Sequence, residues 1–183
     1  MALDAIVEIE GKAGRREIPL ENFHLLPGAT PQRESMLAPG ELIVAVRLPA
    51  EAAQFAAHAR YLKVRERTSY AFAMVSAAVA LRIENAAIKD ARVALGGVAL
   101  KPWRARQAEQ ILRGARADAG SFRYAAAAAL ADARPSGDNA FKIELARRVV
   151  ARALALAAAG TPGRAPALPA SPLAAISGVS THA

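Results

Sequence analysis

The chain has 183 residues and a formal net charge of +8, and 54% of its residues are hydrophobic although only 5% are aromatic. This length suits one domain, or one domain plus part of another. The absence of cysteine excludes disulfides, thiolate metal ligands and a cysteine nucleophile within the chain. Basic residues are spread along the whole chain without a basic block, so we interpret the positive charge as compositional.

The first third of the chain predicts short strands and loops. Residues 3–10 alternate apolar and charged side chains, and residues 15–20 return as a second strand after a glycine-bounded turn. The breakers within residues 21–40 predict a loop, and residues 41–49 predict a strand that a proline ends. Residues 50–57 predict an alanine-rich connector of about one helical turn. Because a two-stranded ribbon needs a surface to lie on, we expect the chain to begin within a domain.

The middle of the chain predicts an antiparallel sheet. Residues 58–64 have strand character, and residues 72–84 and 88–99 predict a hairpin around Asn85-Ala86-Ala87. Pro102 is expected to end the sheet region.

Three helices are predicted after the sheet, at residues 104–112, at 121–133, and from a cap at Asp138 or Asn139 to about residue 159. The expected apolar stripe of the third helix consists of Phe141, Leu145, Val149 and Leu156. The predicted fold class is therefore α+β, with a three-stranded antiparallel sheet packed on a three-helix bundle. We expect domains at residues 1–50 and 58–159, followed by a disordered tail at residues 160–183.

Few residues point to catalysis. His24, His58 and His182 are far apart in the sequence and lack a carboxylate at ligand spacing, so we expect no metal site. No Ser-His-acid set or carboxylate pair is evident from spacing. The pair Gly96-Gly97 lacks the residues of a phosphate loop, and we expect it to permit close approach of a helix or of the other sheet face.

A basic cluster stands at the entrance of the sheet region. Lys63, Arg65 and Arg67 alternate, so on a strand all three would lie on one face. The cluster is either a solvated strand end or a site for an anion or an electron-rich cofactor, in which a fixed cation stabilises developing negative charge.

A membrane segment is not expected. Asp4, Glu8 and Glu10 stand where a signal peptide would be apolar, and no apolar run approaches the roughly 20 residues that span a bilayer.

Several motifs occur in an order that resembles a known family: YLKVRERTSYAFA at residues 61–73, PGELI at 39–43, ALGGVA at 94–99, KPWR at 101–104 and NAFKIELA at 139–146. The sequence resembles the FAD-binding (medium) subunit of the molybdenum hydroxylases, which include xanthine dehydrogenase, carbon monoxide dehydrogenase and bacterial aldehyde oxidoreductases. The aldehyde oxidoreductase branch is the most similar, through FHLLPG at 23–28 and KPWR. The resemblance covers residues 2–158.

The resemblance implies that residues from about 61 to 159 form the C-terminal domain of such a flavoprotein, and that residues 1–50 are a remnant of its FAD-binding domain. The family carries a glycine-rich pyrophosphate loop upstream, which this chain lacks. We therefore interpret the chain as a C-terminal fragment of the subunit, from a split or frameshifted gene or a start codon assigned too late.

The resemblance also implies a cofactor, FAD, with Ile43 near the ring and Lys63 at the strand end beside it. A cation there would favour the reduced, anionic flavin. The implied function is electron relay from iron–sulfur clusters through FAD to an acceptor. The implied partners are a molybdenum-cofactor large subunit, a [2Fe–2S] small subunit and the missing N-terminal FAD-binding part. By itself the chain is expected to be inactive and not to hold FAD tightly.

One alternative comes from another class. The chain could be a non-catalytic basic α+β interaction module that docks an acidic partner or nucleic acid. For the flavin subunit, we expect a cytoplasmic location, with export to the periplasm alongside a partner subunit as the alternative.

Overall fold

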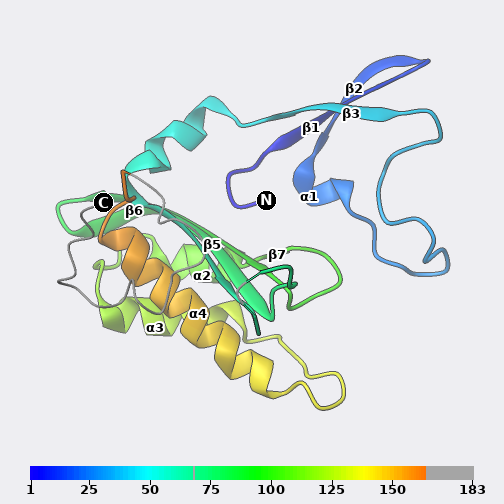
Figure 1. Ribbon diagram of the computed structural model, residues 1–183. Helices are drawn as coiled ribbons and strands as arrows, with labels where there is room; N and C mark the ends of the chain where they lie inside the picture. Colours follow the sequence, from blue (N-terminus) through cyan, green and yellow to red (C-terminus); the bar gives the residue numbers. More distant parts are fainter. Residues whose placement is uncertain (68, 164–183) are drawn as a thin grey trace, which may run out of the picture.

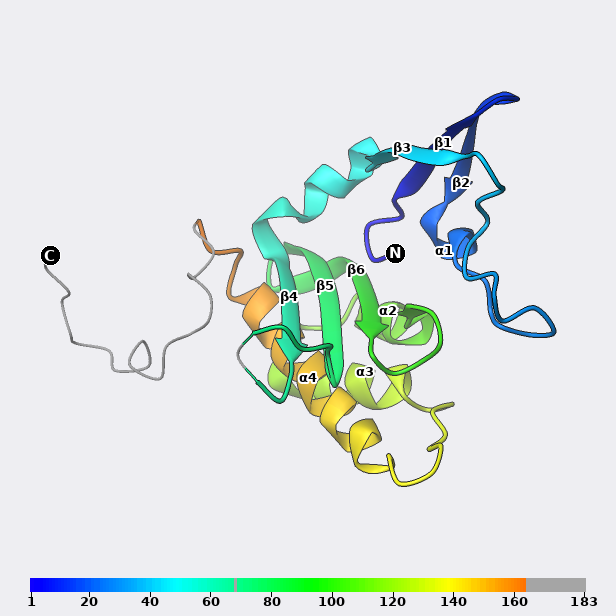
Figure 2. The same ribbon diagram turned by 45° about the vertical axis from the view of Figure 1, so that its right-hand side comes forward.

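The computed structural model describes residues 1–67 and 69–163, which form two antiparallel sheets and a layer of helices (Figure 1). Most of the tail predicted at residues 160–183 lies outside the described residues. The α+β class predicted from the sequence is confirmed, and the helices lie against the second sheet (Figure 2).

The first sheet has three strands in the order β2-β1-β3, formed by β1 (Ile6–Gly11), β2 (Gly14–Pro19) and β3 (Leu42–Arg47). All three strands were predicted from the sequence. The loop expected at residues 21–40 instead follows a single helical turn, α1 (Leu20–Phe23). A small core under the sheet consists of Val7, Ile9, Ile18 and Phe23.

The connector between the sheets is longer than predicted. It forms a 3₁₀ helix, η1 (Ala50–His58), of nine residues rather than one turn. Phe55 is its buried residue, and its ring lies 4.9 Å from the guanidinium carbon of Arg92 on the second sheet. This contact anchors η1 to the sheet that it leads into.

The second sheet has the strand order β4-β5-β6-β7, formed by β4 (Ala59–Val64), β5 (Val75–Glu84), β6 (Ala87–Gly96) and β7 (Trp103–Arg104). Asn85 and Ala86 both have positive φ, as a two-residue hairpin turn requires.

The predicted count of three strands is wrong by one, because β7 returns to the sheet after Pro102 and pairs Trp103 with Leu95.

The three predicted helices are confirmed as α2 (Arg106–Leu112), α3 (Ala119–Ala129) and α4 (Phe141–Ala158). They cover one face of the four-stranded sheet (Figure 2). Alanines such as Ala108, Ala125 and Ala153 are fully buried between these layers. Their small side chains allow the helices to approach the sheet closely.

The details of α4 differ from the prediction. Phe141 is 56% exposed and Leu156 is 36% exposed, so neither belongs to the buried stripe. The buried positions are instead Ala146, Val149, Val150, Ala153, Leu154 and Ala157. Neither predicted cap is used: the N-cap position is Ala140, and the Asn139 side chain accepts a hydrogen bond from the Ser136 amide in the preceding loop.

Candidate functional site

The candidate site lies on the face of the four-stranded sheet that points away from the helices, which we call the open face. Strand register builds it from two cross-strand rows. One row runs Tyr61, Ala78, Ala94 and Arg104, and the next runs Lys63, Ser76 and Gly96. The centre of the open face is therefore made of small side chains, with Tyr61 and Lys63 at the β4 edge and Arg104 at the β7 edge.

The sequence of β5 explains why this face is flat. Val75, Ala77, Val79 and Leu81 alternate toward the helices and enter the main core. The intervening positions carry Ser76, Ala78 and Ala80, which cannot rise far above the strands. A planar molecule could lie along such a surface in contact with backbone and methyl groups.

The pair Gly96-Gly97 permits a close approach, although not the approach that was expected. A Cβ on Gly96 would lie 2.6 Å from the Ser76 Oγ, and one on Gly97 would lie 2.7 Å from the Ala73 carbonyl oxygen. Gly97 also has a φ of +74°, which a side chain would strain. The near neighbours are thus Ser76 on β5 and the two residues just before β5, Ala73 and Met74, rather than a helix or the other sheet face.

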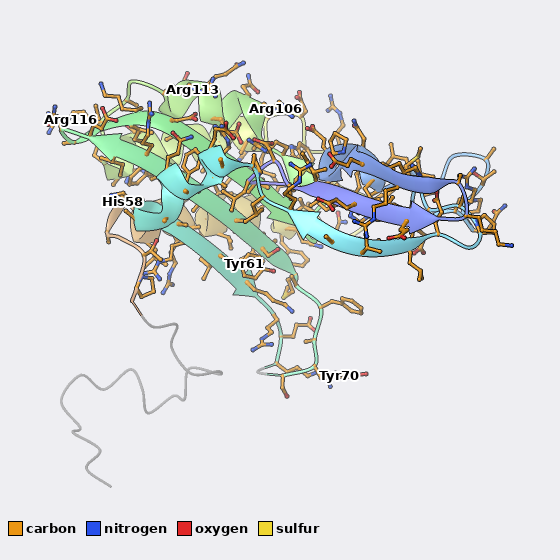
Figure 3. The ribbon with its side chains drawn as sticks, turned by 90° about the horizontal axis from the view of Figure 1, so that it is seen from above. His58, Tyr61, Tyr70, Arg106, Arg113 and Arg116 are labelled. Atoms are coloured by element: carbon orange, nitrogen blue, oxygen red, sulfur yellow. The ribbon has the colours of Figure 1, made fainter. Side chains whose placement is uncertain are left out.

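The N-terminal residues cover part of the open face. A cavity of about 410 Å³ lies between them and the sheet, with Met1 and Leu3 on one side and Tyr61, Ala78 and Ala80 on the other. Figure 3 shows Tyr61 on this side of the sheet, and Tyr70 at the tip of a loop that extends away from it. The row of Lys63, Ser76 and Gly96 does not line this cavity.

Charged side chains join the open face to the start of the chain. The Arg104 Nη1 donates to the Asp4 Oδ1 at 2.7 Å and to the Met1 carbonyl oxygen at 2.6 Å, and its Nε donates to Glu109. Burial lowers the pKa of Arg104, but the hydrogen bonds to Glu109 and Asp4 outweigh burial and raise it. Arg92 also lies 3.4 Å from the Asp4 carboxylate.

The basic cluster predicted on one strand face is only partly on a strand. β4 ends at Val64, so Lys63 is the one member of the cluster that the sheet positions. Arg67 instead donates from its Nε to the Tyr70 carbonyl oxygen at 3.1 Å, and its guanidinium lies 6.0 Å from the Tyr70 ring. Arg67 therefore helps to close the loop between β4 and β5.

The structure places the two predicted site residues on different sheets. Lys63 is exposed at one end of the open face, opposite Ser76. Ile43 is 46% exposed on β3, in the three-stranded sheet, where it pairs with Ile9. Neither residue lines the cavities of about 480, 500, 410 and 350 Å³.

Several residues of the open face were not identified from the sequence. Ser76, Ala78 and Ala94 become neighbours of Tyr61 and Lys63 only through the strand register. The available signal was the alternation of valine with small residues in β5, which marks one buried face and one flat face.

Among residues 1–67 and 69–163, no group of three or more histidine or acidic side chains is arranged to hold a metal ion. Within the same residues, no helix has the length and apolar character that crossing a membrane requires.

Two family models match the chain. Residues 60–157 match the CO dehydrogenase flavoprotein C-terminal domain, and residues 1–51 match the FAD binding domain in molybdopterin dehydrogenase. The two matches together cover nearly all of both sheets and of the four α-helices, and most of η1 lies between them.

Individual relatives agree with these models. The chain is 45% identical over 161 residues to the aldehyde oxidoreductase FAD-binding subunit PaoB of Escherichia coli K12, a region that is 86% of this chain and 46% of that protein. Its fold is similar to that of a chain of carbon monoxide dehydrogenase from Hydrogenophaga pseudoflava (TM-score 0.75, 32% identity, 86% of this chain and 54% of that chain). It is also similar to a chain of quinoline 2-oxidoreductase from Pseudomonas putida 86 (TM-score 0.72, 26% identity, 86% and 53%).

The chain spans about half the length of the curated relatives that it matches. The resemblance seen in the sequence motifs is confirmed by the family models and by these relatives. The comparisons give no support to the alternative of a non-catalytic interaction module.

Proposed function

The chain belongs to the CO dehydrogenase flavoprotein C-terminal domain family, and we propose that it forms part of the FAD subunit of a molybdenum hydroxylase. Its N-terminal part matches the FAD binding domain in molybdopterin dehydrogenase. In this role it contributes to electron transfer from iron–sulfur clusters through FAD to an acceptor. The 45% identity to an aldehyde oxidoreductase FAD-binding subunit favours that branch of the family.

The open face is the single observation that carries this proposal. Its centre of Ser76, Ala78, Ala94 and Gly96 suits one side of a planar ring system, because no long side chain stands in the middle. Tyr61 and the exposed Lys63 border it on β4. These residues are therefore compatible with a flavin ring. The described residues offer no glycine-rich loop for the pyrophosphate of FAD.

Bound FAD supplies the one- and two-electron chemistry of this enzyme class. Lys63 then acts through its position at the end of the open face. Its ammonium group would place a positive charge beside a bound ring and would favour the reduced state. For Ile43 we propose apolar contact near the ring, made from the exposed strand β3.

The exposed strand β3 suggests how the site is completed. All six of its residues are exposed, and in the described part of the chain it pairs on one side only, with β1. We propose that further FAD-binding polypeptide covers β3 and holds the remaining groups of FAD. A molybdenum-cofactor subunit and a [2Fe–2S] subunit are the proposed partners of the assembled enzyme.

Affinity purification from cells that coexpress these candidate partners tests the proposal. We expect the tagged chain to bring down a molybdenum-containing subunit, and flavin absorbance near 450 nm to appear in the complex. The 183-residue chain purified alone should show little flavin absorbance. Stoichiometric FAD on the isolated chain would contradict the proposal that further polypeptide is needed to hold FAD. Salt-sensitive DNA binding without any such partner would contradict the function itself.

A further inference from the structure

A second cavity, of about 480 Å³, lies on the helical side of the protein, away from the open face. It is bounded by the loop between β6 and β7, the loop between α3 and α4, and the first turn of α4. Its volume is in the range of small-molecule sites, which is roughly 300–1,000 Å³.

The walls of this cavity are mostly apolar. Trp103, Leu130 and Ile143 approach from β7, from the end of α3 and from α4. Leu130 belongs to the main core, and Trp103 and Ile143 pack against that core. The half-buried indole of Trp103 offers a flat aromatic surface. A planar ring is the shape that stacks on such a surface.

Two cations line the same cavity. The Lys142 Nζ donates to the Gly97 carbonyl oxygen at 2.6 Å, which fixes the ammonium group between α4 and the β6–β7 loop with donors to spare. Among the residues that the structure describes, the Arg134 guanidinium has no recorded hydrogen bond or ion pair. The lining contains no aspartate or glutamate, so nothing in the wall neutralises the two cations.

The neighbouring cavities lack this combination. The one beside it, of about 500 Å³, shares Trp103, but its lining holds the carboxylate of Glu21 as well as the cations Lys101 and Arg104. The Arg104 guanidinium is already bonded to Asp4 and Glu109. The cavity over the open face has one cation, Arg60, and no ring except that of Tyr61.

We propose that the cavity between α3, α4 and the β6–β7 loop binds a small aromatic carboxylate. The ring packs against Trp103 and between Leu130 and Ile143, and the carboxylate lies at Arg134 and Lys142. Arginine and lysine give the charge-assisted hydrogen bonds that a carboxylate accepts. This site is independent of the proposed flavin surface, and its failure would leave the flavin proposal intact.

The chain contains a single tryptophan, which makes the test direct. The indole N–H of Trp103 gives one resonance in the spectrum of the ¹⁵N-labelled 183-residue chain. Titration with 2-naphthoate should shift this resonance saturably, with a Kd of about 1 mM or tighter. The neutral analogue 2-naphthamide has the same ring system without the charge, and it should bind at least about tenfold more weakly.

Two variants test whether 2-naphthoate binds in this cavity. Arg134→Gln should weaken 2-naphthoate about tenfold, because it removes one charged partner of the carboxylate from an exposed position. Lys101→Gln, in the adjacent cavity that shares Trp103, should leave the affinity unchanged. No saturable shift, equal binding of the amide, or an effect of Lys101→Gln without one of Arg134→Gln would each overturn the proposal.

Discussion

The guanidinium of Arg104 and the carboxylate of Glu109 face each other inside the protein, and each side chain is only 4% exposed. Glu109 also accepts a hydrogen bond from the Val93 amide at 2.8 Å, so one carboxylate ties α2 to both β6 and β7. Arg104 extends this network to Asp4 at the start of the chain. The buried ion pair thus holds the guanidinium that reaches the half-exposed Asp4, two residues before β1.

Loss of the Glu109 carboxylate should destabilise the protein strongly. In Glu109→Ala the Arg104 charge stays buried with fewer partners, and the Val93 amide loses its acceptor. We expect a decrease of about 3–5 kcal/mol in the free energy of unfolding, measured by urea denaturation. The matched control is Glu144→Ala, which breaks an exposed pair with Arg148 on α4 and should leave the urea midpoint close to wild type. Equal midpoints for the two variants would contradict the structural role of Glu109.

Asp4 should control how firmly the first sheet is held. Asp4→Asn removes the charge that binds Arg104 and Arg92 but leaves both sheets intact. Hydrogen exchange should therefore become faster in β1, while β5 keeps its wild-type protection. If the exchange rates of β1 and β5 increase equally, the ion pairs of Asp4 do not hold the first sheet specifically.

The carboxyl of Glu41 should titrate far below its ordinary range. Hydrogen bonds from Arg16 and from the Ala38 amide lower its pKa from 4.5 to about 2. Because the folded pKa is the lower one, the stabilisation is complete above pH 4.5 and is lost as the pH falls toward 2. A ¹³C NMR titration should show the low pKa, and Arg16→Gln should raise it. Arg15→Gln, at the adjacent position, should leave the pKa of Glu41 unchanged. A wild-type pKa near 4.5 would contradict the hydrogen bonds described for Glu41.

The exposed strand β3 should make the isolated chain associate. Leu42 is 71% exposed at the start of an edge strand, and such strands pair with other chains unless a charge prevents it. Sedimentation should show concentration-dependent association that Leu42→Lys decreases. Leu100→Lys changes a leucine on the β6–β7 loop that is 79% exposed, and should have no such effect. A chain that stays monomeric at all concentrations would contradict this reading of β3.

The secondary structure was largely predictable because its signals are local. Alternation and turn-forming residues marked the strands, and Gly114, with a φ of +80°, follows the end of α2 as expected. The strand β7 was missed because two residues carry no period. The α4 stripe was misassigned because buried alanines weaken the apolar pattern, whereas large residues such as Phe141 can stay exposed at a helix end.

The candidate site was less predictable because it depends on contacts between distant residues. The position of Lys63 on one face of β4 follows from alternation alone. Its neighbour Ser76 follows only from the register, and the bond from Arg104 to Asp4 joins residues 100 positions apart. No local pattern encodes such pairs, and the family resemblance supplied the function that spacing could not.

The flavin midpoint potential of the assembled enzyme tests the central claim most directly. In the complex with its FAD-binding, iron–sulfur and molybdenum partners, Lys63→Gln removes the proposed cation beside the ring. The potential should then fall by about 30 mV or more, which for two electrons corresponds to roughly 1.4 kcal/mol of lost stabilisation of the reduced state. Lys89→Gln, an exposed lysine on β6, is the control and should leave the potential unchanged. An unchanged potential in Lys63→Gln would contradict the placement of the flavin at the open face.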